Sequence, residues 1–200
     1  MGKTSSRERR HEKNRQSILD AAQRIIVEQG PAELSMRSLA QRIDYSPSGL
    51  YEYFDSKEQI LQAVCSTGHR QLTQAMRQVD ERLSARDYLF EIGKVYIDFA
   101  AANPRLFPLM FAATPAEPPD AGMLSEDSSY RVLLEAIQRG IDDGVFITSE
   151  GFGLPEMAFA AWAMVHGISM LRMTMPASAP TFAAYRDEAL LVVSRGLMTG

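Results

Sequence analysis

The chain has 200 residues, of which 46% are hydrophobic and 23% charged, a balance typical of a soluble globular protein with a real hydrophobic core. Its single cysteine, Cys65, excludes an internal disulfide framework and any metal site built from several cysteines. The net charge of −4 argues by itself against nucleic acid as a partner.

The charge is unevenly distributed along the chain. Residues 1–57 hold ten Lys and Arg against eight Asp and Glu, a net of +2, and residues 1–15 hold six against two, a net of +4. The remaining 143 residues hold 11 against 17, a net of −6. A basic arm on an acidic body indicates either an anionic partner for the N-terminal part or a solvated, disordered tail.

Helical spacing of apolar residues begins near residue 18 and continues through almost the whole chain, and no segment alternates as a strand does. Ile18, Ala22 and Ile25 mark the first helix, which Gly30 and Pro31 end. The sequence therefore predicts an all-α fold of about nine helices.

Two short helices separated by three residues are predicted over about 35–54. Ser35 is placed to cap the first of them. Ser46 caps the second, with Pro47 at its first helical position, and this helix is predicted to run through Phe54. Asp44 falls in the intervening turn, where the chain needs a left-handed conformation that Asp tolerates better than most residues.

Six further helices are predicted towards the C-terminus. They cover 57–82, the segment after the cap Ser84, "RLFPLMF" with a kink or early end at Pro108, the segment from Tyr130 to Gly144, 155–173, and the segment that Thr181 caps. Residues 114–127 are rich in proline and acid and are predicted to form a loop.

The two short helices form a helix-turn-helix pattern, and the second carries groups suited to DNA. Ser48 and Gly49 are small, so the second helix can enter a major groove closely. Four groups on or beside it can reach phosphates: Ser46, Tyr51, Tyr53 and Lys57. Since Tyr51 and Tyr53 lie on different faces and Leu50 and Phe54 fill the apolar positions, at least one of the tyrosines must point outward.

Residues 12–60 resemble the DNA-binding domain of the TetR family of transcriptional regulators, through "ILDAAQRIIVEQG", "SMRSLAQRI" and "SPSGLYEYFDSKEQIL". The resemblance implies three groups of DNA contacts: Ser35, Arg37 and Ser38 from the first helix; Pro47, Ser48 and Gly49 at base edges; and Tyr51, Tyr53 and Lys57 at phosphates. The basic arm could add contacts through Arg9, Arg10, Lys13 and Arg15. This chain has Ile43-Asp44-Tyr45 where the family often has Ala-Gly-Val, and Ser48 where a glycine is common, so no relative's base preference transfers to it.

The C-terminal part is similar only in architecture to one regulatory-domain class of the family, through "YIDFAAANPRLFPLMF" and "AAWAMVHGISML", the latter with a Trp-x-x-x-His-Gly pattern. The resemblance implies a homodimer in which helices 155–175 and 182–198 pair as a four-helix bundle. Four small residues would allow close approach there: Ala160, Ala161, Ala163 and Gly167. A two-fold dimer would read a palindromic operator on double-stranded DNA. The expected division is 1–57 for the arm and DNA-binding domain and 58–200 for the helical ligand-binding and dimerisation domain.

Apolar aromatic residues and methionines of the middle helices are candidates for binding a small-molecule effector. They are Tyr96, Phe99, Phe107, Met110, Phe111, Tyr130, Leu134, Phe159, Trp162, His166 and Met170. Methionine adapts to irregular ligands, although each of these residues equally suits an ordinary core. The hypothesis is therefore a repressor released by a lipophilic ligand, and the alternative is a member that activates or that a partner protein controls.

No cofactor, metal site or catalytic residue is predicted, because no nucleophile elbow, phosphate loop or clustered catalytic residues are present. His166 has no ligand partners at metal-binding spacing and is expected to be a hydrogen-bonded core or interface residue that stacks with Trp162. Redox sensing through Cys65 would need a resolving partner. With no apolar stretch after the basic N-terminus, no signal peptide is predicted and the expected location is the cytoplasm. Met157–Leu171 is expected to be too short for a membrane span and to form a buried helix.

Overall fold

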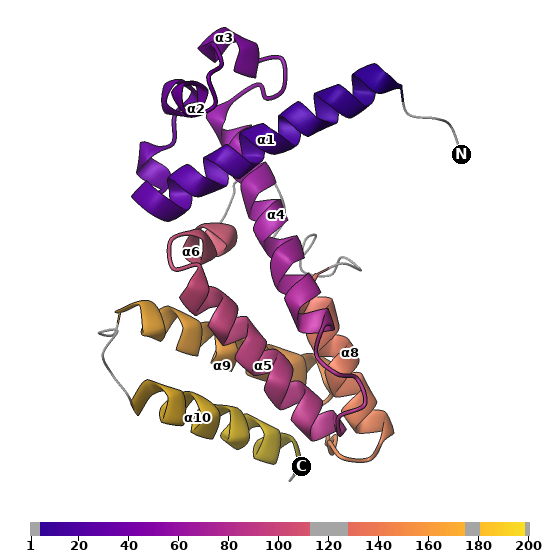
Figure 1. The fold of residues 1–200 in the computed structure, drawn as a ribbon. Coiled ribbons are helices and arrows are strands. Elements are labelled where there is room, and N and C mark those ends of the chain that lie inside the picture. Colours follow the sequence, from indigo (N-terminus) through magenta and orange to yellow (C-terminus); the bar gives the residue numbers. More distant parts are fainter. Residues whose placement is uncertain (1–4, 113–127, 175–180, 199–200) are drawn as a thin grey trace. The chain divides into compact units, whose positions relative to one another are not determined.

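The computed structural model describes residues 5–112, 128–174 and 181–198, and within these ranges the chain is built from helices joined by short turns (Figure 1). The helices are α1 (Ser6–Gln29), the 3₁₀ turn η1 (Pro31–Glu33), α2 (Met36–Arg42), α3 (Pro47–Leu50), α4 (Lys57–Arg77), α5 (Ala85–Ala102), α6 (Leu106–Phe111), α8 (Ser129–Asp142), α9 (Leu154–Thr174) and α10 (Thr181–Met198). An isolated bridge between Ser149 and Phe152 is the one β-type pairing within these ranges. The predicted all-α fold is confirmed, whereas the predicted loop at 114–127 lies outside the described residues.

Packing divides the chain into two compact units. The first contains residues up to Gly68 together with Arg105–Ala112, and so includes α1 to α3, the first part of α4, and α6. The second contains the rest of α4 with α5, α8, α9 and α10. The expected functional boundary between residues 57 and 58 stays a prediction, since packing alone does not show where one function ends and another begins.

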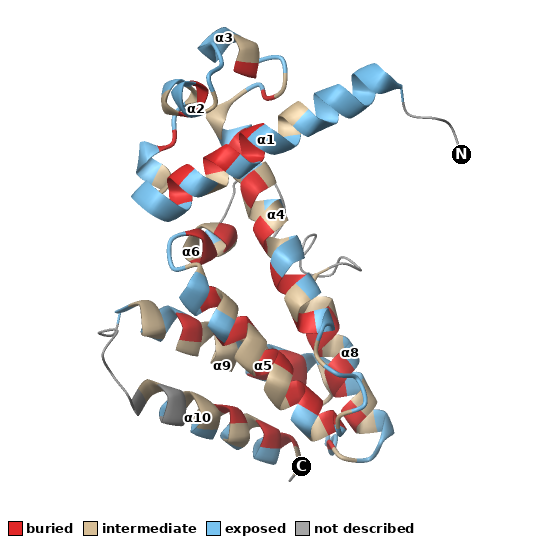
Figure 2. Ribbon diagram, in the orientation of Figure 1, coloured by how far each residue is buried: buried red, intermediate tan, exposed pale blue. Residues whose placement is uncertain are grey.

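The first unit is organised around the apolar face of α1. The predicted stripe is buried, with Ile18, Ala22 and Ile26 fully inaccessible. Leu39 from α2 and Leu50 from α3 are equally inaccessible and close the core from the helix-turn-helix side (Figure 2). Each buried isoleucine or leucine contributes roughly 1.5–3 kcal/mol, so this small core can hold the short helices that could not persist alone.

The long helix predicted over 57–82 ends five residues early, at Arg77. The next two amides donate to carbonyls three residues back, Gln78 to Ala75 and Val79 to Met76. Beyond them the Asp80 carboxylate accepts a hydrogen bond from the backbone amide of Arg82 at 3.0 Å. A short acidic side chain that bonds nearby backbone competes with helix, which explains why the pattern overshot.

The kink predicted at Pro108 is wrong. Pro108 is the third residue of α6, which runs from Leu106 to Phe111 without a break. The first amides of any helix lack an intrahelical acceptor, so proline loses no hydrogen bond there.

In the second unit α5 packs against α8, α9 and α10. The predicted cap at Ser84 is confirmed, because its hydroxyl accepts from the Asp87 amide at 3.1 Å. Ser128 caps α8 in the same way, at 3.0 Å from the Arg131 amide. Gly144, with φ of 68°, turns the chain after α8 as predicted.

The apolar helix α9 matches its predicted extent to within one residue at each end but differs from its prediction in burial. It has 21 residues and a mean hydropathy of 1.2 in its most apolar window, so by length and composition it could cross a membrane. Such evidence is weak, since a packed helix of a soluble protein passes the same test. Only 28% of that window is buried within one chain, so α9 is not the buried helix that was expected.

Candidate nucleic-acid interface and ligand cavity

The turn between α2 and α3 has the geometry that the sequence predicted. Asp44 is the one non-glycine residue with positive φ, 56°, within the described ranges. The amide of Tyr45 donates to the Ala40 carbonyl at 2.9 Å, the six-to-one bond of a Schellman motif. This closure ends α2 sharply and aims the chain into α3.

The second helix of the motif begins as predicted and ends sooner. Ser46 accepts from the Gly49 amide at 3.0 Å, with Pro47 as the first helical residue. The helix stops at Leu50 rather than Phe54, and Tyr53 then donates to Leu50 three residues back. Glycine and tyrosine are weak helix formers, so this stretch tightens into a turn instead of extending the helix.

The candidate DNA contacts fall into two sets by exposure. Ser35, Arg37, Ser46, Pro47, Ser48 and Tyr51 are exposed, whereas Ser38, Gly49, Tyr53 and Lys57 are half-buried. The Ser38 hydroxyl donates to the Glu33 carbonyl at 2.8 Å and accepts from the Ser35 amide at 2.9 Å. Ser35 and Ser38 therefore hold the start of α2 whether or not they touch DNA.

Tyr51 and Tyr53 have different environments, in line with the expectation that at least one of them points outward. Tyr51 is 54% exposed. Tyr53 accepts a hydrogen bond from the Asn14 side chain at 2.9 Å, and its ring stacks on His11 with centroids 4.7 Å apart. Sequence reasoning missed these two partners, because a contact between residues about 40 positions apart leaves no local signal.

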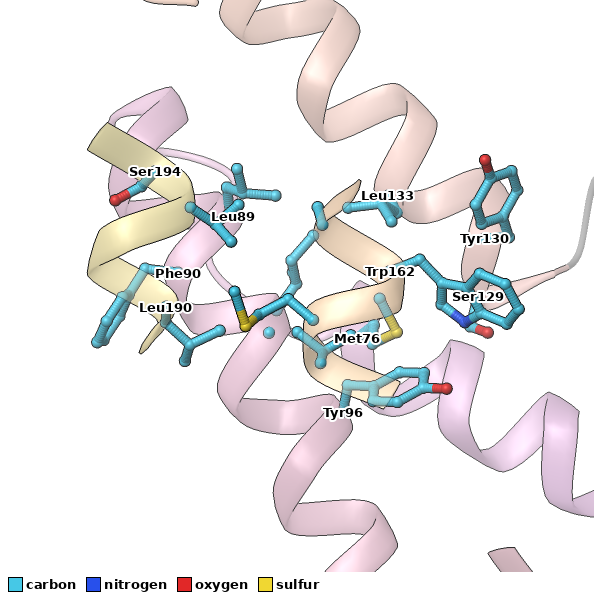
Figure 3. A pocket seen from close by; sticks show the side chains of 16 residues that line it. Met76, Leu89, Phe90, Tyr96, Ser129, Tyr130, Leu133, Trp162, Leu190 and Ser194 are labelled. Atoms are coloured by element: carbon cyan, nitrogen blue, oxygen red, sulfur yellow. The ribbon is translucent and has the colours of Figure 1, made fainter. Parts of the chain in front are cut away.

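A cavity of about 30 Å³ lies inside the second unit (Figure 3). It is lined by Met76, Leu89, Phe90, Ile92, Gly93, Tyr96, Ser129, Tyr130, Leu133, Ala161, Trp162, Met164, Val165, Leu190, Val193 and Ser194. None of these residues is charged, so an ion bound there would lose its hydration without compensation. The space holds about one water molecule, so a larger ligand must displace side chains such as the two methionines.

A polar cluster lies at the Tyr96 side of the cavity. The Tyr96 hydroxyl is 3.0 Å from Nδ1 of His166, and the His166 ring is 5.5 Å from the Trp162 ring. Burial raises the pKa of Tyr96, an effect that a hydrogen bond with Trp162 opposes, and burial lowers the pKa of His166. Both shifts favour the neutral forms, so the cluster offers uncharged hydrogen-bonding groups. The prediction of a hydrogen-bonded histidine is confirmed, and its ring contacts that of Trp162 at a tilt of 40° rather than stacking on it.

The eleven candidate effector residues do not gather at one place. Tyr96, Tyr130 and Trp162 line the cavity. Phe107, Met110 and Phe111 belong to α6 and thus to the first unit. Phe159 and Met170 are exposed, and Phe99, Leu134 and His166 are half-buried outside the lining.

Several lining residues were missed by sequence reasoning, chiefly those of α5, α9 and α10. Leu89, Gly93 and Tyr96 follow helical i, i+4, i+7 spacing, which shows a shared face. That spacing is the same for a solid core and for a cavity wall. Only the packing of several helices showed where space remains.

Comparison with known families accounts for both units. Residues 18–64 match the family described as "Bacterial regulatory proteins, tetR family", and residues 89–190 match "Tetracyclin repressor-like, C-terminal domain". The chain belongs to the TetR family.

Solved structures with this fold match almost the full length of the chain. A protein of unknown function from Rhodococcus sp. RHA1 is 24% identical, with a TM-score of 0.75 over 92% of this chain and 95% of that one. BioQ with its natural double-stranded DNA operator is 20% identical, with a TM-score of 0.63 over 93% and 98%. A variant of TetR from Acinetobacter baumannii AYE, in complex with minocycline, is 17% identical, with a TM-score of 0.63 over 90% and 94%. No curated protein matched the sequence significantly.

As a TetR-family member the chain is a DNA-binding transcriptional regulator with an N-terminal helix-turn-helix. Likeness to the solved structures shows the fold alone. The roles of individual residues at the DNA and in the cavity stay predictions.

Proposed function

We propose that this regulator is a cytoplasmic homodimeric repressor, without enzymatic activity, that binds a palindromic operator and leaves it when a small uncharged ligand enters the second unit. The observation that carries the DNA-binding role is the exposed start of α3. Ser46, Pro47 and Ser48 are open to solvent there, and Tyr51 beside them is 54% exposed. Small side chains allow the helix to enter a groove closely, and the hydroxyl groups here and the ammonium group of Lys57 can bind phosphates.

Exposed apolar residues on the last two helices support the dimer. Of nine large hydrophobic residues exposed in the described chain, five lie on these helices: Phe159, Met170, Leu171, Tyr185 and Val192. Apolar surface concentrated in this way marks an association face. On α9 the small residues Ala160 and Ala163 are exposed as well, whereas Gly167 is half-buried and Ala161 is buried and lines the cavity.

The uncharged cavity supports an effector that is largely hydrocarbon with one neutral polar group. Its apolar lining matches the hydrocarbon, and the hydroxyl of Tyr96, which lines the cavity, can exchange a hydrogen bond with an alcohol, phenol or ketone. Entry of such a ligand would favour one of two arrangements of the DNA-binding units, which is regulation by population shift.

An unbiased selection of DNA sequences with purified protein tests the DNA-binding role. We expect a palindromic sequence with half-sites about 34–36 Å apart or a multiple of that distance. Tyr51→Phe and Lys57→Ala should bind it more weakly without changing the preferred bases, because phosphate contacts carry no sequence information. No enriched sequence at moderate salt would contradict the proposal.

Control by a partner protein, in a repressor or an activator, is a second candidate, and the small size of the cavity favours it. Trp162 is the one tryptophan of the chain and lines the cavity, so its fluorescence reports occupancy directly. Titration with decanol, decanoate and decylamine separates the candidates. A fluorescence change with decanol but not with the two ions, together with release of DNA, supports control by a small ligand. No fluorescence change with any of a range of neutral lipophilic compounds supports control by a partner protein.

A further inference from the structure

The N-terminal half of α1 extends beyond the core of the first unit. Residues 6–13 are exposed throughout, whereas burial in α1 starts at Ile18 (Figure 2). The extension nevertheless has a defined start. Ser5 accepts from the Glu8 amide at 3.2 Å, and the Glu8 carboxylate accepts from the Ser5 amide at 2.6 Å. This capping box explains why the described part of the basic arm is helical from Ser6 onward.

The extension is fixed through Tyr53 to the helix-turn-helix at about 35–54, which we call the recognition segment. His11 stacks on the Tyr53 ring, and Asn14 donates to its hydroxyl. Tyr45, in the turn before α3, meets the same ring edge-on with centroids 6.5 Å apart. These contacts set the rotation of α1 about its axis relative to α3.

Two arginines continue the face of α1 that contacts Tyr53. Arg7 precedes His11 by four residues and Arg10 precedes Asn14 by four, so each lies one turn further along the same face. Arg7 lies about 10 Å along the axis from Asn14, roughly the rise of three base pairs. The cations of this face therefore lie beside and beyond the recognition segment.

The other basic residues of the arm are placed differently. At about 100° per residue, Lys13 points about 100° away from Asn14 and Arg9 about 140° away. Arg9 and Lys13 share a shallow hollow with the acids Glu12 and Asp20, so their face has mixed charge. The Arg15 guanidinium lies over the Phe54 ring at 4.9 Å and belongs to the packed part of the unit.

We propose that the Arg7 and Arg10 face of α1 is a second DNA-binding element, which contacts backbone phosphates of the duplex flanking each operator half-site. The proposal rests on the proposed DNA-binding function. It narrows the basic arm to two residues and assigns them positioning contacts that carry no base preference. Arg9 and Lys13 then provide a control with the same loss of charge from the same helix.

The test compares two duplexes that carry the selected operator, one trimmed to the operator and one with about five more base pairs at each end, roughly half a helical turn. Wild-type protein should bind the longer duplex more tightly. Arg7→Gln/Arg10→Gln should bind both duplexes equally, and the steepness of log affinity against log salt should fall by roughly one for each contact removed. Arg9→Gln/Lys13→Gln should keep the wild-type preference, and equal thermal midpoints establish that all variants fold.

Equal losses in the two double variants would overturn the proposal, because general charge would then explain the effect. Absence of any flank effect in the wild type would also overturn it. If the selection yields no operator, the proposed function fails separately, and a duplex of arbitrary sequence at low salt becomes the probe. Weaker binding by Arg7→Gln/Arg10→Gln than by Arg9→Gln/Lys13→Gln would still support the second element, and equal binding would refute it.

Discussion

Individual polar residues shape the recognition segment before any DNA is present. Asp44 adopts the left-handed conformation at the turn, and Ser46 caps α3. Ser35 and Ser38 cap α2 through reciprocal bonds to each other's backbone amides. Residues that look like DNA contacts in the sequence therefore also hold the motif together, and a loss of binding on mutation needs a stability control.

Substitutions at Asp44 should separate backbone strain from side-chain chemistry. Asp44→Val should lower the free energy of unfolding by about 1–3 kcal/mol, because a β-branched residue is strained at positive φ. Asp44→Asn should change it by less than about 0.5 kcal/mol, because asparagine tolerates this conformation. Urea denaturation of both variants checks this, and equal losses would show that the carboxylate itself is needed.

The pH dependence of stability should report the burial of His166. Burial lowers the pKa of His166 in the folded chain, so the unfolded chain binds this proton more readily, with a pKa of about 6.5. The stability that neutral His166 contributes is present above that pH and is lost as pH falls through the lower folded pKa. His166→Asn should therefore lose less stability than the wild type between about pH 7 and pH 5, measured by urea midpoints. Parallel profiles would contradict this assignment.

At the scale of elements, tight packing around glycine fixes the end of α8. The amides of Val145 and Phe146 both donate to the Gly140 carbonyl at 2.9 Å. A β-carbon at Gly140 would lie 2.0 Å from the Phe146 ring, which is itself 2% exposed. The chain that follows α8 can therefore pack Phe146 tightly against the helix because residue 140 has no side chain.

Gly140→Ala should cost about 1–3 kcal/mol of unfolding free energy, the usual range for overpacking a core. Phe146→Leu relieves the clash but leaves a small cavity where the ring was. The double variant should lose less unfolding free energy than the sum of the losses in the two single variants, since the residues touch. Strict additivity in thermal or urea unfolding would show that the two positions do not clash.

At the scale of the whole molecule, the proposed function depends on a second copy of the chain. Phe159 and Leu171 of α9 and Tyr185 and Val192 of α10 are each 61–65% exposed in the described part of the chain. A two-fold partner would bury them and would present two recognition segments to a palindrome. The proposed function therefore needs the dimer as much as it needs the DNA-binding residues.

Charge placed on this face should separate the protomers. Val192→Asp or Leu171→Asp should shift the protein to monomers in sedimentation equilibrium and weaken operator binding, because an unpaired charge is costly in an apolar interface. Ile147→Asp is the matched control, since Ile147 is 48% exposed but lies outside α9 and α10. Dissociation of the control and not of the other two would place the interface elsewhere.

Local chemistry by itself determined the helices of this protein and the details of its recognition turn. Apolar spacing, the caps at Ser46 and Ser84 and the left-handed Asp44 act between residues a few positions apart, so they can be read from the sequence. The stop of α4 at Arg77 was missed because a side-chain bond at Asp80 competes with a continuing apolar stripe.

Contacts between distant residues were decided only by the tertiary structure. The pairing of Asn14 with Tyr53, and the placement of α6 in the first unit, join segments that share no local pattern. The cavity beside Trp162 is equally invisible in the sequence, because the same apolar spacing fills a core or lines a hollow. The physical reason is that hydrophobic spacing fixes which face of a helix is buried, whereas the partner of that face depends on the packing of the whole chain.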